Sequence, residues 1–311
     1  MRNYKSIFDT IFNEVGRVVV GQQTVVEQMI IAMLCDSNAL LEGYPGLAKT
    51  LSVKTLARLM DLKFSRIQST PDLMPSDITG TYIIEDHAGR REFKFQQGPV
   101  FANLILADEI NRATPKTQSA LLEAMQEKQV TVGNTTFKLD MPFFVLATQN
   151  PIEQEGTYPL PEAQADRFLF KIKTDYPTYD DEIKIVDRYS SEAEEPKLKV
   201  ILEKKNLLAL QSIVRQVPIA TDLKQTAVKL VTETRKRKDI FEYGASPRAS
   251  IGIILASKAR ALIAGRTHVS SDDINTLAYP ILRHRVILNF EAERKGIGVD
   301  DAIKDVLSKV K

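Results

Sequence analysis

Short apolar runs alternate with longer amphipathic stretches over the first 177 residues. The longer stretches carry apolar residues three or four positions apart, as a helix with one buried face requires. One of them begins with Thr24 and Glu27, whose spacing predicts a capping box, and another begins with Thr114 and Pro115, which predict a cap and a first-turn proline. The short runs predict strands, and their alternation with helices predicts a parallel sheet flanked by helices. The expected strands are residues 39–42, 63–68, 103–108, 142–150 and 167–173, and the expected helices include 24–34, 50–60 and 115–126.

The first expected strand leads directly into the loop GYPGLAKT, and a helix follows. This is the arrangement of a phosphate-binding loop, in which backbone N–H groups, a lysine and a hydroxyl face the phosphates. Gly43, Lys49 and Thr50 match the pattern, whereas Ala48 stands where a second glycine is expected. Alanine would cost about 1 to 2 kcal/mol at a positive φ angle and little at a negative one. We expect Gly43 and Gly46 to take the unusual backbone angles of the loop.

Two segments interrupt the alternation of strands and helices. Residues 78–97 have the pattern of two strands around a turn at Gly89, and residues 129–139 predict a hairpin that turns at Gly133-Asn134. Beyond about residue 178 helical patterns dominate to the end of the chain. We therefore expect an α/β domain with two β-hairpin insertions, residues 1–177, followed by an all-helical domain, residues 178–311.

Composition and charge fit an ordinary soluble globular protein. Of the 311 residues, 43% are hydrophobic and 26% are charged, and 42 basic against 40 acidic residues give a net charge of +2. That charge argues against a protein held to nucleic acid by a strong overall field. The single Cys35 cannot form an internal disulfide, the first residues lack the apolar core of a signal peptide, and no apolar run approaches the roughly 18 residues of a membrane helix. The simplest expectation is a cytoplasmic protein.

Polar residues follow two of the expected strands, where parallel-sheet proteins bind ligands. In a phosphate-loop enzyme, the first acid of Asp108-Glu109 would hold the magnesium shell and the second would polarise an attacking water. An acidic pair near a helix start is also favoured for purely structural reasons. The phosphate loop earlier in the chain makes the catalytic role the stronger hypothesis. Asn150 could orient the same water, although asparagine before Pro151 is also an ordinary turn residue.

Lys49 and Arg248 both fall in the expected first turn of a helix, and Arg248 follows a predicted cap, Ser246, and a first-turn proline, Pro247. The helix dipole disfavours a cation there by a few tenths to about 1 kcal/mol. A phosphate between the two cations would remove this penalty. The alternative is that Arg248 is an ordinary solvated arginine at a helix end, because the penalty is small.

Arg167 stands at the very start of an expected buried strand. It could pair with Asp166 or Glu162 at the surface, and local chemistry does not separate that role from a catalytic one.

Five motifs occur in a fixed order across nearly the whole chain: GYPGLAKT, LILADEINRA, FFVLATQNP, PLPEAQADRF and GASPRA. Together they resemble the MoxR family of AAA+ ATPases, whose members are similar to this sequence in carrying alanine before the lysine of the loop. The resemblance implies an AAA+ P-loop domain with a helical lid domain, and it implies that both hairpins face the pore of a ring.

The resemblance also implies a role for each motif. Catalytic roles fall to Glu109 of Walker B, Asn150 as sensor 1, Arg167 as an arginine finger and Arg248 as sensor 2. Thr50 and Asp108 would hold Mg2+, and residues 20–22 would lie near the adenine. The residues implied to contact ATP are Val20, Gly21, Gln22, Gly43, Tyr44, Pro45, Gly46, Leu47, Ala48, Lys49, Thr50, Leu51, Asp108 and Arg248.

Members of this family are usually hexameric rings that act as chaperone-like remodellers, often with partners that contain a von Willebrand factor A domain. We therefore predict an ATP-hydrolysing homo-hexamer, with ATP and Mg2+ as cofactors, that remodels or activates a protein partner.

Two alternatives remain. The first is a nucleic-acid motor, which the run TRKRK, residues 234–238, would support, although consecutive cations on a helix point in different directions. The second is the ATPase subunit of a metal chelatase. The scattered His87, His268 and His284 lack metal-ligand spacing, so this chain would not hold the metal itself.

Overall fold

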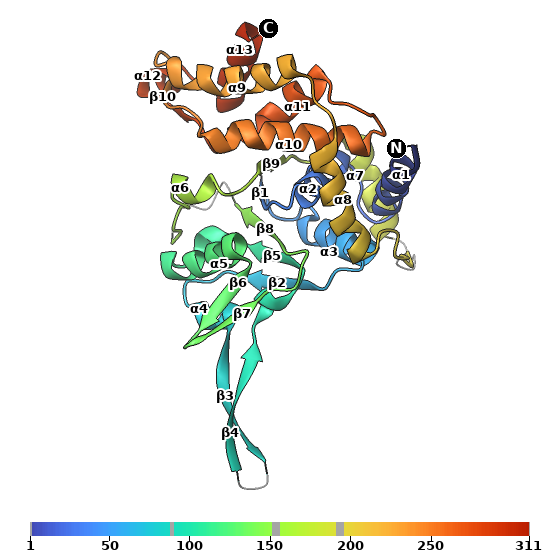
Figure 1. Ribbon diagram of the computed structural model, residues 1–311, viewed down its shortest axis with the longest axis vertical. Coiled ribbons are helices and arrows are strands. Elements are labelled where there is room, and N and C mark those ends of the chain that lie inside the picture. The colour runs from blue at the N-terminus through green and yellow to red at the C-terminus, as the bar shows by residue number, and fades with distance from the viewer. Residues whose placement is uncertain (1, 88–89, 151–155, 191–195, 311) are drawn as a thin grey trace.

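A parallel sheet forms the middle of the molecule, with a layer of helices at one end and a long hairpin projecting from the other (Figure 1). The computed structural model describes residues 2–87, 90–150, 156–190 and 196–310, without the side chains of residues 2, 3, 87 and 90. None of the helices in these ranges is long and apolar enough to cross a membrane.

The five predicted strands form one parallel sheet. They are β1 (Ala39–Gly43), β2 (Phe64–Gln68), β5 (Leu104–Asp108), β8 (Phe144–Gln149) and β9 (Phe170–Thr174). Their order in the sheet is β2-β5-β8-β1-β9, and each neighbouring pair is parallel. The carboxyl ends of β1, β5 and β8 therefore lie side by side at one edge, each at the start of a predicted motif.

Alternate residues of the three central strands, β1, β5 and β8, enter two separate hydrophobic clusters. Leu104 and Leu106 pack on one face of the sheet, and Ile105 and Ala107 pack on the other. The first face is covered by α1 (Arg2–Gly16), α2 (Gln23–Leu34), α3 (Lys49–Leu59) and helices of the lid; the second is covered by α5 (Pro115–Glu127) and the hairpin region. Burial on both faces explains why the central strands β1, β5 and β8 are mostly apolar, whereas the edge strands β2 and β9 carry exposed polar residues.

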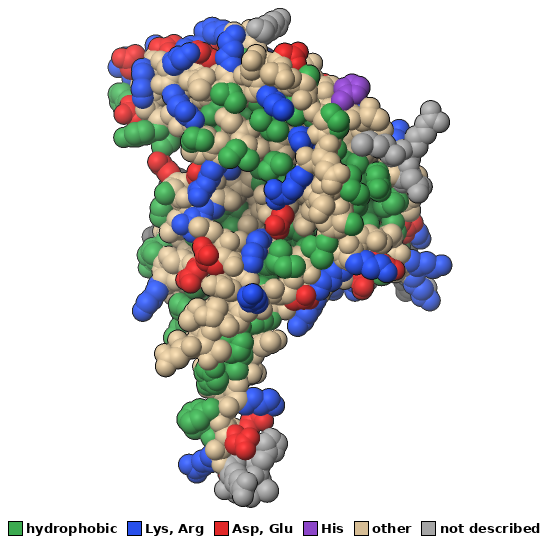
Figure 2. Space-filling model, in the orientation of Figure 1, with side chains coloured by type: hydrophobic (Ala, Val, Ile, Leu, Met, Phe, Trp, Pro, Cys, Tyr) green, Lys and Arg blue, Asp and Glu red, His purple; other side chains and the backbone are tan. Residues whose placement is uncertain are grey.

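Both predicted hairpins are present. The first follows α4 (Pro75–Thr79) and consists of β3 (Gly80–His87) and β4 (Arg90–Gln97); the second consists of β6 (Gln129–Val132) and β7 (Thr135–Lys138). Gly133 turns the second hairpin with a φ angle of +60°, whereas the turn expected at Gly89 lies outside the described residues. Phe95 stacks on Phe137 with ring centres 4.2 Å apart, which joins the two hairpins. Beyond this contact the first hairpin projects from the body of the molecule and carries both hydrophobic and charged side chains (Figure 2).

Helices dominate the chain after β9, as predicted. They are α7 (Tyr179–Tyr189), α8 (Lys204–Gln216), α9 (Thr221–Lys236), α10 (Pro247–Ile263), α11 (Ser271–Leu282), α12 (Phe290–Arg294) and α13 (Val299–Lys309). This part also contains two short antiparallel strands, β10 (Phe241–Tyr243) and β11 (Ile287–Leu288). The remaining elements of the described chain are α6 (Glu162–Ala165) and the 3-10 turns Pro99–Phe101 and Ile110–Arg112.

The predicted helix starts are correct at two sites and wrong at a third. Thr114 and Ser246 each precede a first-turn proline, as expected, at the starts of α5 and α10. The capping box of Thr24 and Glu27 does not form, because α2 begins at Gln23 and Thr24 already lies inside it. Glu27 instead pairs with Arg260 of α10 at 3.4 Å.

Candidate functional site

The loop after β1 lines a pocket of about 420 Å³ at the carboxyl edge of the sheet. Residues 45–51 form one wall, and Asp108, Glu109, Thr148 and Asn150 form the other. Lys49, the predicted metal ligands and the residues predicted to position water thus meet in one cavity, because the strands that precede them are neighbours in the sheet.

Ala48 has a positive φ angle of +53°, so the costlier of the two conformations considered for it is the one that occurs. An L-residue in this region carries a cost of about 1 to 2 kcal/mol. Gly46 also has a positive φ, +82°, as expected. Gly43 does not: it is a strand residue, and a Cβ there would lie 2.7 Å from the carbonyl oxygen of Thr174 on β9. The need for glycine at position 43 therefore comes from close strand packing and not from its φ angle.

Lys49 is the first residue of α3, and its ammonium donates a hydrogen bond to the carbonyl of Gly43 at 2.5 Å. Burial lowers the pKa of Lys49 from its ordinary value, and the nearby Asp108 and Glu109 act in the opposite direction by favouring the charged form. The lysine charge is therefore held inside the loop, opposite the acids, where a phosphate would need it.

Asp108 ends β5, and both of its carboxylate oxygens have partners. Thr148 of β8 donates to one oxygen at 2.6 Å, and the guanidinium of Arg66 on β2 donates to the other from Nε at 3.1 Å and from a terminal nitrogen at 2.5 Å. These contacts fix the carboxylate at the pocket wall and give it a cation partner.

Glu109 is held in a strained conformation, with a φ angle of +54°. Its backbone N–H donates to the hydroxyl of Thr148 at 2.8 Å. Its carboxylate accepts a hydrogen bond from Gln68 at 3.3 Å and pairs with Arg112 at 3.2 Å. Strained backbone that surrounding contacts maintain is typical of functional sites.

The pocket residues fit a magnesium ion bound together with a nucleotide. Mg2+ usually takes one or two protein oxygens and completes its shell with phosphate oxygens and waters. Thr50 and Asp108 line the same pocket and could supply those oxygens. Within the described residues no group of three or more metal-ligating side chains forms a cage of its own.

A second, mostly apolar cavity of about 430 Å³ adjoins the loop and shares residues 46–48 and Leu51 with the phosphate pocket. Val20 and Gln22, which the family resemblance implies lie near the adenine, line it together with Pro177 and Ile185 from the chain around α7. Gly21 lies in the neighbouring cavity, where a Cβ would come within 3.0 Å of the Asp181 carboxylate. Tyr44 lines neither of these cavities and stacks on Tyr176 with ring centres 4.8 Å apart.

Arg167 and Arg248 do not line the phosphate pocket. They line a separate cavity of about 390 Å³, with Lys128, Asp166 and Arg285 also in its wall. We call this cavity the arginine pocket. The sequence led us to expect Lys49 and Arg248 around one phosphate. In the structure they line different cavities, because α10 presents Arg248 beside Arg167. Basic side chains gather where the lid meets the sheet in Figure 2.

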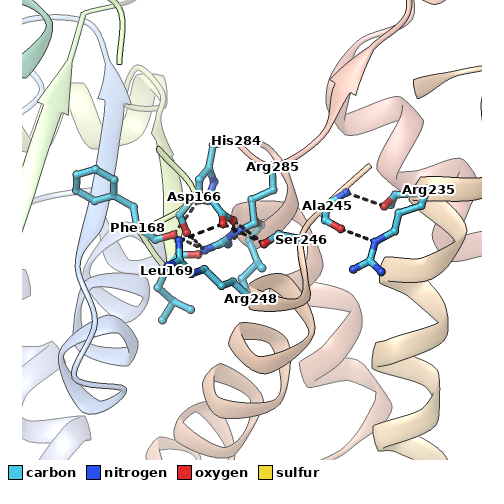
Figure 3. Close-up of polar contacts among 11 residues, drawn as sticks. Asp166, Phe168, Leu169, Arg235, Ala245, Ser246, Arg248, His284 and Arg285 are labelled. Atoms are coloured by element: carbon cyan, nitrogen blue, oxygen red, sulfur yellow. Dashed lines mark hydrogen bonds and ion pairs between the residues drawn. The ribbon is translucent and has the colours of Figure 1, made fainter. Parts of the chain in front are cut away.

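Arg167 is exposed and does not form the surface ion pair considered for it. The carboxylate of Asp166 instead accepts hydrogen bonds from Ser246, Arg248 and Arg285 (Figure 3). Among the ion pairs found between described residues, none joins Arg167 to Glu162. The guanidinium of Arg167 is thus available at the rim of the arginine pocket.

Comparison with known proteins agrees with this geometry. The model of the ATPase family associated with various cellular activities (AAA) matches residues 38–170, and an AAA lid domain matches residues 233–306. The chain is 47% identical to Chaperone MoxR1 of Mycobacterium tuberculosis, over 96% of this chain and 80% of that protein. This protein belongs to the MoxR family of AAA+ ATPases.

Other relatives of this MoxR-family ATPase span it almost completely. Protein MoxR of Methylorubrum extorquens is 28% identical over 96% of this chain and 92% of that protein. A solved structure from Cytophaga hutchinsonii, described as a candidate ATPase, is 47% identical, with a TM-score of 0.93 over 99% of this chain and 96% of that one. The family and the fold both identify an ATP-hydrolysing enzyme.

Three residues of the MoxR-family site were not singled out from the sequence: Arg66, Gln68 and Thr148. Arg66 and Gln68 lie on β2, and Thr148 lies on β8, the two strands that flank β5. Their signal is that each is a polar residue in the second half of an expected strand. Which strands flank the acids could not be read from the sequence.

The strained alanine of the loop gives a direct prediction. Glycine takes a φ of +53° without strain, so Ala48→Gly should relieve the strain of the loop. The free energy of unfolding should therefore rise, or should fall by less than it does when glycine replaces an unstrained alanine. The control is Ala209→Gly, at an exposed position inside α8, where glycine should cost about 0.5 to 1 kcal/mol. Urea denaturation of both variants measures the difference, and an equal loss in both would show that position 48 carries no strain.

Proposed function

We propose that this protein is a ring-forming ATPase, a homo-hexamer, that uses ATP hydrolysis to remodel or activate a protein partner. The observation that carries the proposal is the division of the site between two cavities. The phosphate pocket holds Lys49 and the acids, whereas the exposed arginines line the arginine pocket. One copy of the chain therefore offers two half-sites, and a second copy is needed to join them.

The phosphate pocket would perform the first half of the chemistry. Lys49 and the N–H groups at the start of α3 would bind the terminal phosphates. Bound through Thr50 and Asp108, Mg2+ would neutralise phosphate charge. Glu109 would polarise the attacking water, and Asn150, at the end of β8, would orient it. The contacts of Glu109 with Gln68 and Arg112 keep its carboxylate at the pocket wall.

The arginine pocket would supply the second half to a neighbouring copy. Hydrolysis develops negative charge on the departing phosphoryl group, and an arginine placed against it is worth about 10³ to 10⁵ in rate. Arg167 is exposed, and 53% of the Arg248 side chain is exposed, so both can reach outward. Their shared cavity leads us to assign Arg248, like Arg167, to the nucleotide of the neighbouring subunit.

The nucleic-acid motor is less well supported, because the cations of the run 234–238 are engaged locally. Arg235 donates to the carbonyl of Ala245 at 2.8 Å (Figure 3), and Lys236 pairs with Glu233 at 2.7 Å. Arg237 pairs with Asp239 and Asp305, and Lys238 donates to the carbonyl of Glu242. These side chains stabilise the end of α9 and the turn before α10 and do not form a groove-binding stripe.

The partner is the least specified part of the proposal. A relative named a chaperone supports a protein substrate, and a von Willebrand factor A domain in that partner is our expectation from the family resemblance. A cytoplasmic location and a division of the chain into residues 1–177 and 178–311 belong to the same proposal.

The first test separates binding from hydrolysis. Lys49→Ala should lose ATP binding, because it removes the charge that faces the phosphates. Glu109→Gln should keep ATP binding and lose about 10² to 10⁴ in turnover, because it removes only the activation of water. Calorimetric ATP titration and phosphate release distinguish these effects. Wild-type ATP affinity in Lys49→Ala would contradict the site.

The second test asks whether the arginines act between copies. Arg167→Ala and Arg248→Ala should each bind ATP and hydrolyse it poorly. Mixing either variant with Glu109→Gln should restore up to about a quarter of wild-type activity if subunits mix randomly in a closed ring, because some interfaces then pair an intact glutamate with intact arginines.

Mixing Arg167→Ala with Arg248→Ala is the matched control and should restore nothing, because every interface then lacks one arginine. Subunit exchange is verified by labelled copies. If exchange occurs and Glu109→Gln restores no activity at any ratio, the arginines do not act in trans.

A further inference from the structure

One buried arginine holds the backbone around Arg167. Arg285 follows α11, and only 3% of its side chain is exposed. It donates to the Asp166 carboxylate at 2.8 Å, and it also donates to the carbonyl oxygens of Asp166 at 3.0 Å, Phe168 at 2.5 Å and Leu169 at 3.0 Å (Figure 3). Its contacts therefore bracket position 167 on both sides.

Asp166 connects the same segment to the start of α10. The hydroxyl of Ser246 donates to both carboxylate oxygens, at 2.9 and 3.0 Å, and Arg248 approaches one of them at 3.4 Å. The two arginines of the arginine pocket are thus tied to one carboxylate: Arg167 is its neighbour in the chain, and Arg248 is its ion-pair partner.

His284 adds a further contact to this segment. Burial, with Arg285 nearby, lowers the pKa of His284 well below its ordinary value of 6.5, so the imidazole is neutral. Its Nε2 lies 2.9 Å from the carbonyl oxygen of Phe168, which can only accept, so Nε2 carries the proton and donates. The Phe168 carbonyl therefore accepts from both His284 and Arg285.

A buried ion pair is a costly way to stabilise a fold, because desolvation offsets much of the attraction. The guanidinium, however, presents five donors in a rigid plane, and here four of its hydrogen bonds go to one short segment. Such an arrangement fixes the direction of the backbone more than it adds stability.

We propose that Arg285 is a positioning residue, which clamps residues 166–169 against the lid so that Arg167 and Arg248 enter the neighbouring active site together. This inference rests on the proposed action of those arginines between copies. It also makes the rate depend on the lid, because α10 begins at the clamp and α11 ends beside it.

The test replaces Arg285 with lysine, which removes the planar set of guanidinium donors and keeps the positive charge. Arg285→Lys should leave the affinity for ATP unchanged, because Arg285 does not line the phosphate pocket. Its kcat should fall by about tenfold to a hundredfold, the loss expected when a catalytic group is displaced by around 1 Å. The matched control is Arg283→Lys, which changes a nearby arginine with 17% side-chain exposure that pairs with Asp300 and does not contact residues 166–169. The control should keep its kcat.

Mixing experiments separate positioning from a merely structural role. Arg285→Lys should regain activity with Glu109→Gln, which supplies an intact arginine pair, and should regain none with Arg167→Ala. If Arg285→Lys does not fold, Asp166→Asn removes the same charge pair with little change in size and is expected to follow the same pattern.

Two results would overturn the inference. One is a wild-type kcat in a folded, assembled Arg285→Lys or Asp166→Asn variant. The other is that the Arg285→Lys or Asp166→Asn variant regains no activity when mixed with Glu109→Gln, although Arg167→Ala does. That result would contradict the clamp but not the proposal that the arginines act between copies. If Arg167→Ala itself fails to recover, the proposed function is wrong and the clamp inference falls with it.

Discussion

Hydrolysis of ATP needs positive charge on both sides of the transferred phosphoryl group, and one copy of this chain offers its cations in two separate places. Lys49 lies in the phosphate pocket, where Arg66 is already paired with Asp108. Arg167 and Arg248 lie in the arginine pocket. This separation follows from the fold, because the lid packs against β9 and delivers α10 beside Arg167. We propose for that reason that catalysis depends on assembly.

The site also contains backbone that the rest of the fold must hold in place. Ala48, just before α3, and Glu109, just after β5, both have positive φ angles, +53° and +54°. Such conformations cost about 1 to 3 kcal/mol each. The close contact of Gly43 with Thr174 and the bond from Glu109 to Thr148 show how the parallel sheet maintains them. The clamp at Arg285 serves the same purpose for Arg167, from the side of the lid.

The sequence predicted what depends on local pattern. The five strands, both hairpins and the helix starts at Thr114 and Ser246 follow from periodicity and capping, which act over a few residues. Sequence-based prediction failed where contacts between distant segments determine which residues meet in the site. Gln68 and Thr148 belong to the site because β2 and β8 flank β5, and strand order is not encoded locally. Arg248 was expected beside Lys49 because both begin helices, but the packing of the lid decides which pocket each one lines.

The most direct test of this account is the rate of ATP hydrolysis per copy, measured over a range of protein concentrations with the oligomeric state followed in parallel by light scattering. The account predicts a rate per copy that rises with concentration and levels off when assembly is complete, because each active site then has a neighbour's arginines. A constant rate per copy down to concentrations at which the protein is monomeric would contradict it.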